Sequence, residues 1–123
     1  MSSIEALRQA LITMPLLQEA QEWGGEEVEE YLDARESDPF DRQWMQTYDA
    51  LQALENERDL NATTIDEIRE TAFLKAYDLT GDGELAGYVS DDFELIAKGL
   101  HFEYTSDFLT AMYNSYKAGR LPR

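Results

Sequence analysis

Apolar residues recur at intervals of three and four along most of the chain, which is the spacing of one helical face. The first such stripe is Ile4, Leu7, Leu11 and Met14, and Pro15 interrupts it. Similar stripes occupy four later segments, at about 40–54, 65–77, 93–100 and 108–116. No segment alternates convincingly with the period of a β-strand. We therefore predict an all-α fold, a compact bundle of six or seven short helices.

Local signals predict where three of these helices begin. Asp38 can cap the free amides of a helix, and Pro39 fits a first helical position. The segment Thr64-Ile-Asp-Glu67 has the spacing of a capping box. Ser90 is an expected N-cap for the helix that contains the 93–100 stripe, and the two aspartates after it suit the helix dipole.

The length of 123 residues, 43% of them hydrophobic, predicts a single domain over residues 1–123. The absence of cysteine excludes disulfides and thiolate chemistry. The longest apolar runs are too short to cross a membrane, and the first residues lack the basic flank and apolar centre of a signal peptide. We expect a cytoplasmic monomer.

The formal net charge of −16 narrows the range of partners. Such a charge repels nucleic acids and anionic lipid surfaces, and it attracts cations and basic protein surfaces. Three classes of function remain: a binder of divalent cations, a mimic of DNA charge, and an inhibitor or immunity protein that covers a basic site.

The segment Asp78-Leu-Thr-Gly-Asp-Gly-Glu-Leu85 presents oxygen atoms at alternate positions. Calcium takes about 6–8 oxygen ligands, and a short loop supplies them by winding around the ion with a glycine at the reversal. Asp78, Thr80 and Asp82 would give side-chain oxygens and Glu84 its carbonyl, so we predict a Ca²⁺ site here.

This pattern resembles the EF-hand calcium loop, and the resemblance extends over residues 70–85. It implies an EF-hand-like helix-loop-helix unit at about 64–100. The family places a bidentate glutamate at position twelve, where this sequence has Val89, so we expect a variant loop over 78–92 that Asp91 or Asp92 completes. In size, acidity and lack of cysteine the chain is also similar to the small cyanobacterial calcium-binding proteins of the CcbP type.

The simpler interpretation of the glycine-bearing segment is a polar turn between two helices. Asp38 and Asp41 are candidates for a second calcium site, and the simpler interpretation of Asp38 is that it serves only as a helix cap.

The function predicted first is therefore that of a cytosolic calcium buffer or a calcium-dependent regulator. The alternative is an acidic protein-binding inhibitor, immunity protein or DNA mimic that covers a basic partner with the acids between Glu26 and Asp41. We do not expect an enzyme, because no substrate-positioning motif accompanies the many carboxylates and His101 is the only histidine.

Overall fold

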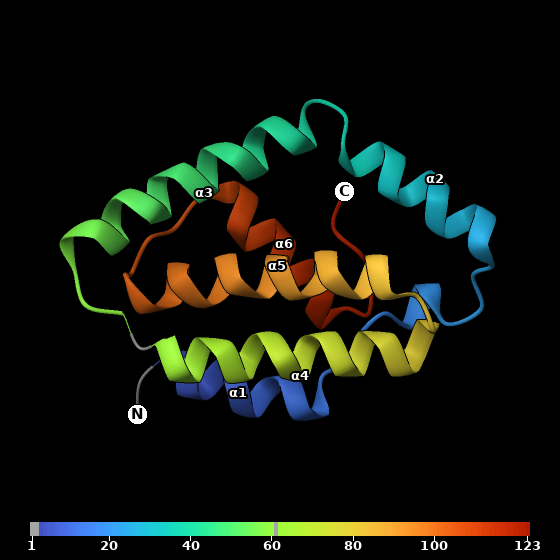
Figure 1. The fold of residues 1–123 in the computed structure, drawn as a ribbon, viewed down its shortest axis with the longest axis horizontal. Helices are drawn as coiled ribbons and strands as arrows, with labels where there is room; N and C mark the ends of the chain where they lie inside the picture. The colour runs from blue at the N-terminus through green and yellow to red at the C-terminus, as the bar shows by residue number, and fades with distance from the viewer. Residues whose placement is uncertain (1–2, 61) are drawn as a thin grey trace.

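Two long helices, α4 (Ala62–Thr80) and α5 (Gly83–His101), pack side by side along the centre of the molecule (Figure 1). This computed structural model describes residues 3–60 and 62–123. Helix α5 packs against α1, α3, α4 and α6, and its buried residues recur at helical spacing through Leu85, Val89, Phe93 and Ile96. The core is therefore built around α5.

The other helices surround this pair. Helix α1 (Ser3–Thr13) packs against α4 and α5, and a short 3₁₀ turn, η1 (Gln18–Ala20), leads on to α2. Helices α2 (Gly25–Arg35) and α3 (Phe40–Glu57) form an arch above α5, as Figure 1 shows. Helix α6 (Asp107–Lys117) packs against α5 and α3, and the segment after it returns beneath α2.

Every regular element within residues 3–60 and 62–123 is helical, so the predicted all-α bundle is confirmed. None of the described helices is both long enough and apolar enough to cross a membrane.

The expected EF-hand-like loop is not confirmed, because only Gly81 and Asp82 separate α4 from α5. Gly81 has a φ of 70° and ends α4, while the carboxylate of Asp82 accepts the Leu85 amide at 2.9 Å and caps α5. The glycine and aspartate pattern therefore forms a tight turn between two helices, the simpler of the two interpretations of this segment.

The predicted helix starts need correction too. Ser90 is not an N-cap, because it lies inside α5 and its hydroxyl donates to the Arg69 carbonyl at 3.1 Å. Helix α4 begins at Ala62, so Thr64 lies within it. Helix α3 begins at Phe40 without a side-chain cap, since the Asp38 carboxylate instead accepts a hydrogen bond from Arg42.

Candidate functional site

The eight predicted calcium ligands lie on several separate elements. Asp78 and Thr80 belong to the last turns of α4, and the Thr80 hydroxyl donates to the Ala76 carbonyl at 2.8 Å. The others are Asp82 in the turn, Glu84, Asp91 and Asp92 along α5, Asp38 in the turn before α3, and Asp41 in the first turn of α3. Among the residues that the structure describes, no three acidic, histidine or cysteine side chains are grouped so that they could hold a metal ion.

Several of these carboxylates are instead bound to arginines. Asp91 pairs with Arg69 at 2.9 Å on the surface, and Asp38 pairs with Arg42 at 2.6 Å. Asp92 is fully buried, with 0% of its surface exposed. The two aspartates that were equal candidates to complete the loop therefore have different environments.

Asp92 is the centre of a buried polar network beneath the arch. Its two carboxylate oxygens accept hydrogen bonds from Arg35 of α2 at 2.6 and 2.7 Å. The same carboxylate accepts the Trp44 indole N–H at 2.9 Å and the hydroxyl hydrogen of Tyr116. A buried charge is tolerated only when it is paired and hydrogen-bonded, and Asp92 meets both conditions.

The Arg35 guanidinium lies between two aromatic rings, at 4.9 Å from the centroids of both Phe40 and Tyr88. Burial lowers the pKa of Arg35, but the hydrogen bonds and the charge of Asp92 raise it by more, so the guanidinium stays charged. Arg35 also donates at 3.2 Å to the Tyr31 hydroxyl, which in turn donates to the Pro122 carbonyl at 2.7 Å. The network therefore joins α2, α3, α5, α6 and the final segment, and it fixes the position of the arch.

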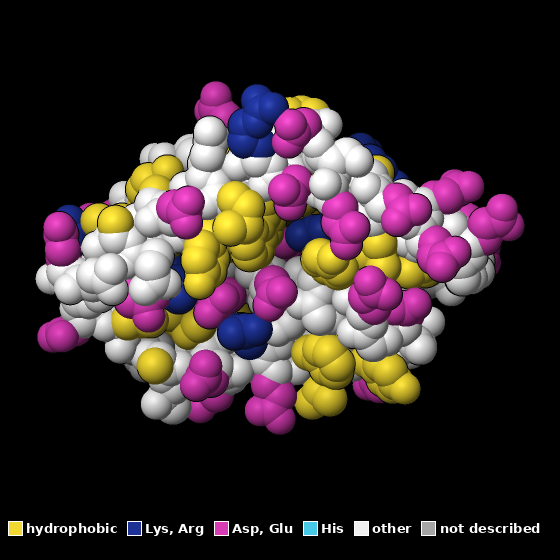
Figure 2. Space-filling view, turned by 45° about the horizontal axis from the view of Figure 1, so that its top comes forward, with side chains coloured by type: hydrophobic (Ala, Val, Ile, Leu, Met, Phe, Trp, Pro, Cys, Tyr) yellow, Lys and Arg dark blue, Asp and Glu magenta, His cyan; other side chains and the backbone are white. Residues whose placement is uncertain are grey.

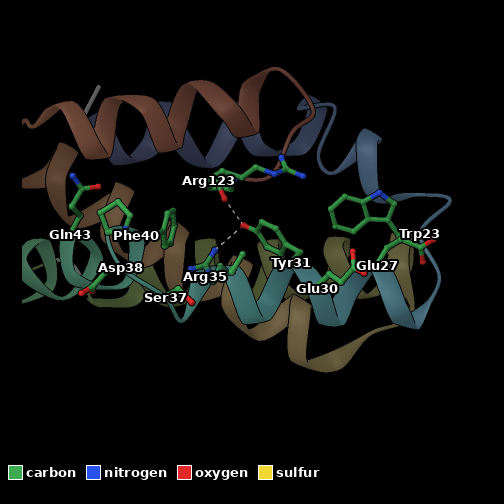
Figure 3. Close-up of a pocket in the computed structure, with 13 residues that line it drawn as sticks. Trp23, Glu27, Glu30, Tyr31, Arg35, Ser37, Asp38, Phe40, Gln43 and Arg123 are labelled. Carbon is green, nitrogen blue, oxygen red and sulfur yellow. Dashed lines mark hydrogen bonds between the residues drawn. The ribbon is translucent and has the colours of Figure 1, made fainter.

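A pocket of about 520 Å³, which we call the Trp23 pocket, opens beside Arg35 (Figure 3). In Figure 3, Trp23 lies at one end and Gln43 and Asp38 at the other, with Tyr31, Arg35 and Phe40 between them. The pocket is lined by Trp23, Glu27, Glu30, Tyr31, Ala34, Arg35, Ser37, Asp38, Pro39, Phe40, Gln43, Pro122 and Arg123. Aromatic walls with a charged rim are typical of sites that bind a partner side chain or a small molecule.

A smaller hollow of about 220 Å³ shares Arg35 and Phe40 with this pocket. Trp44, Met45 and Tyr88 also line it, and 44% of the Met45 surface is exposed. The two tryptophans of the chain thus line different hollows, Trp23 the larger and Trp44 the smaller.

The outer surface of α2 and of the start of α3 is strongly acidic. All eight carboxylates between residues 26 and 41 are exposed: Glu26, Glu27, Glu29, Glu30, Asp33, Glu36, Asp38 and Asp41. The one basic residue in this stretch, Arg35, is buried and paired with Asp92. Figure 2 shows acidic side chains gathered on the side of the molecule formed by α2. We call these eight residues the acidic arch.

Sequence reasoning identified the acids of the arch but missed Arg35, the Trp23 pocket and the structural role of Asp92. The available signal was position, because Arg35 follows Tyr31 and Leu32 on the buried stripe of α2, and Asp92 lies between Val89 and Ile96 on that of α5. Opposite charges on two apolar stripes indicate a buried ion pair.

The sequence profile of a family described as "Immunity protein PIM1" matches residues 9–123. No curated protein matches the sequence.

This match shows that the predicted resemblance to EF-hand proteins and to proteins of the CcbP type is wrong, as is the description of the chain as a calcium-binding protein. The matched region includes the whole of residues 78–92, and the structure has a two-residue turn where the calcium loop was expected. The individual ligand assignments stay predictions from the sequence.

Proposed function

The chain belongs to the Immunity protein PIM1 family, and we propose on that basis that it binds a toxin protein and neutralises it. The observation that supports a protein-binding role most strongly is the acidic arch of eight exposed carboxylates, three of which, Glu27, Glu30 and Asp38, line a pocket with aromatic walls. The family match favours this alternative over the calcium buffer that the sequence suggested first.

The charge of the arch indicates the chemistry of the partner surface. Arg35 is buried and paired with Asp92, and Arg42 offsets the charge of Asp38. The other seven carboxylates of the arch form no ion pair within the described residues, so the arch presents a net negative charge. A complementary partner therefore carries lysines and arginines on the surface that the arch covers. Opposite charges accelerate the encounter, while desolvated aromatic contacts slow dissociation.

We propose that inhibition follows from covering the toxin's basic surface, with no reaction catalysed by this chain. The proposal also includes a monomeric protein that acts in the cytoplasm. Light scattering during size-exclusion chromatography tests the oligomeric state, because a monomer has a mass of 14.1 kDa.

The direct test is protection of growing cells. Candidate toxins, taken from the genes that flank the gene of this chain, are expressed from an inducible promoter with and without the chain. We expect growth to be restored for one such toxin and a stable complex to form between the two purified proteins. Failure of every candidate toxin to be neutralised or bound would contradict the proposed function.

A further inference from the structure

Resting on the proposed function, we infer that the Trp23 pocket binds an arginine side chain of the toxin. The pocket has aromatic walls formed by Trp23, Tyr31 and Phe40. Its volume of about 520 Å³ lies within the range of about 300–1,000 Å³ of pockets that enclose small ligands. A planar guanidinium with an aliphatic stem suits such walls, because the stem packs on the rings and the charge is attracted to their faces.

The rings of this pocket already bind guanidinium groups within the chain. Arg35 lies 4.9 Å from the centroid of Phe40. Arg123 lies 5.9 Å from the ring centroid of Trp23 and 5.5 Å from that of Tyr31. These contacts show that the rings of the pocket pack against guanidinium groups, and the same chemistry suits the guanidinium of a partner arginine.

The remaining charge of the pocket is negative. Arg35 is neutralised by Asp92, and Arg123 pairs with Glu19 at 2.8 Å. Asp38 pairs with Arg42. Once these three pairs are formed, two carboxylates of the lining, Glu27 and Glu30, remain without a cation among the residues that the structure describes.

Glu30 is the freer of these two carboxylates. Glu27 accepts the Gly24 amide at 2.9 Å and so caps α2, whereas Glu30 is exposed and forms no ion pair among residues 3–60 and 62–123. An entering arginine would therefore gain the charge of Glu30 without breaking an existing bond. A neutral anchor would leave that charge unused.

The first test needs no toxin. The protein is labelled with 5-fluorotryptophan, which gives one ¹⁹F resonance for Trp23 and one for Trp44, and the Trp44→Phe variant assigns them. It is titrated with N-acetyl-arginine amide and with N-acetyl-citrulline amide, which has a similar shape and no charge. We expect the Trp23 resonance to move at least about three times further with the arginine probe, while the Trp44 resonance stays in place.

Two variants give the matched control for charge. Glu30→Gln is expected to reduce the shift of the Trp23 resonance at least about twofold. Glu57→Gln changes an exposed glutamate at the far end of α3 and is expected to leave the shift unchanged. Equal responses to the arginine and citrulline probes, or equal effects of the two variants, would overturn the inference.

The second test uses the labelled protein with the toxin identified by the protection assay. We expect the Trp23 resonance to move in the complex, and Trp23→Ala and the charge reversal Glu30→Lys to weaken binding about tenfold or more. Because Glu30 is exposed, the Glu30→Lys variant is expected to fold even if the Trp23→Ala variant does not. Protection without any response at Trp23 overturns this inference alone, whereas a chain that neither protects nor binds overturns the proposed function as well.

Discussion

Arg35 and Asp92 are 57 positions apart in the sequence and form an ion pair in the interior, with two hydrogen bonds of 2.6 and 2.7 Å. Both side chains are almost fully buried, at 4% and 0% exposure. Because Arg35 belongs to α2, which carries most of the acidic arch, and Asp92 belongs to the central helix α5, this pair connects the proposed binding surface to the core. The stability of the arch therefore depends on an interaction that lies beneath it.

Removing one charge of this pair should destabilise the fold strongly. We expect Asp92→Asn to lower the free energy of unfolding by about 3 to 5 kcal/mol, because the Arg35 charge would stay buried without a counter-ion. Urea denaturation followed by circular dichroism measures this loss. The matched control is Asp91→Asn, whose surface pair with Arg69 should contribute less than about 1 kcal/mol. Equal losses for the two variants would contradict the role given to Asp92.

The neighbouring Tyr31 predicts a specific response to alkaline pH. Burial raises the pKa of its hydroxyl to about 12 from an ordinary value of 10.0, and the negative charge of Asp92 adds to the shift while Arg35 opposes it. Because the pKa is raised in the folded state, losing the hydroxyl proton costs more free energy in the folded chain than in the unfolded chain. The neutral hydroxyl of Tyr31 therefore contributes stability that is complete below about pH 10 and is lost as the pH rises towards 12.

We therefore expect Tyr31→Phe to lose less stability on alkalinisation than the wild type. Between pH 9 and pH 11 the difference should be roughly 1 kcal/mol, measured by urea denaturation at each pH. Parallel curves for the two proteins over this range would show that Tyr31 is not held in its neutral form by the fold.

Two glycines of α5 should respond to alanine in opposite directions. A Cβ at Gly99 would lie 2.9 Å from the Leu109 side chain and 3.2 Å from the Tyr104 carbonyl, so Gly99→Ala should cost about 1 to 3 kcal/mol by forcing α6 away. A Cβ at Gly87 would meet nothing within 4 Å, so Gly87→Ala should raise stability by up to about 1 kcal/mol. Thermal melts of both variants test this contrast, and destabilisation by both would contradict the packing described for α5.

The sequence predicted the fold class well because the apolar stripes report burial directly. The prediction from sequence was wrong over residues 78–92, where the local turn and capping signals conflict with the apolar stripe of α5. Gly81 and Asp82 have the composition of a metal loop, yet Leu85, Val89 and Phe93 continue one apolar face through the segment. Packing of that face against α4 stabilises a continuous helix, so tertiary contacts override the N-cap signal of Ser90.

The candidate site was predictable only in part. The exposed acids of the arch are evident from sequence, because they are closely spaced between residues 26 and 41 and lie opposite a narrow apolar stripe. The Trp23 pocket is not evident from sequence, because its walls come from two distant parts of the chain, residues 23–43 and the pair Pro122 and Arg123. No periodicity indicates that the final segment returns to Tyr31.

If charge steers the toxin to the arch, association should depend on salt. Stopped-flow measurements with the purified toxin should show the association rate constant falling about tenfold or more between about 20 mM and about 500 mM NaCl. The dissociation rate constant should change much less, since aromatic contacts are not screened. An association rate constant that is independent of salt would contradict electrostatic steering.

The affinity of the toxin for two equally charged variants tests the central claim most directly. In the arch variant, four acids become amides: Glu26→Gln, Glu29→Gln, Glu30→Gln and Asp33→Asn. In the control variant, four exposed acids outside the arch are changed in the same way: Glu57→Gln, Asp66→Asn, Glu70→Gln and Glu103→Gln. Both variants have a net charge of −12, because each loses four of the negative charges that give −16.

Isothermal titration calorimetry gives the dissociation constant of each complex. We expect the arch variant to bind the toxin at least about ten times more weakly than the control variant, which should stay close to the wild type. Equal weakening of the two variants would mean that only overall charge attracts the toxin, and it would contradict binding through the acidic arch.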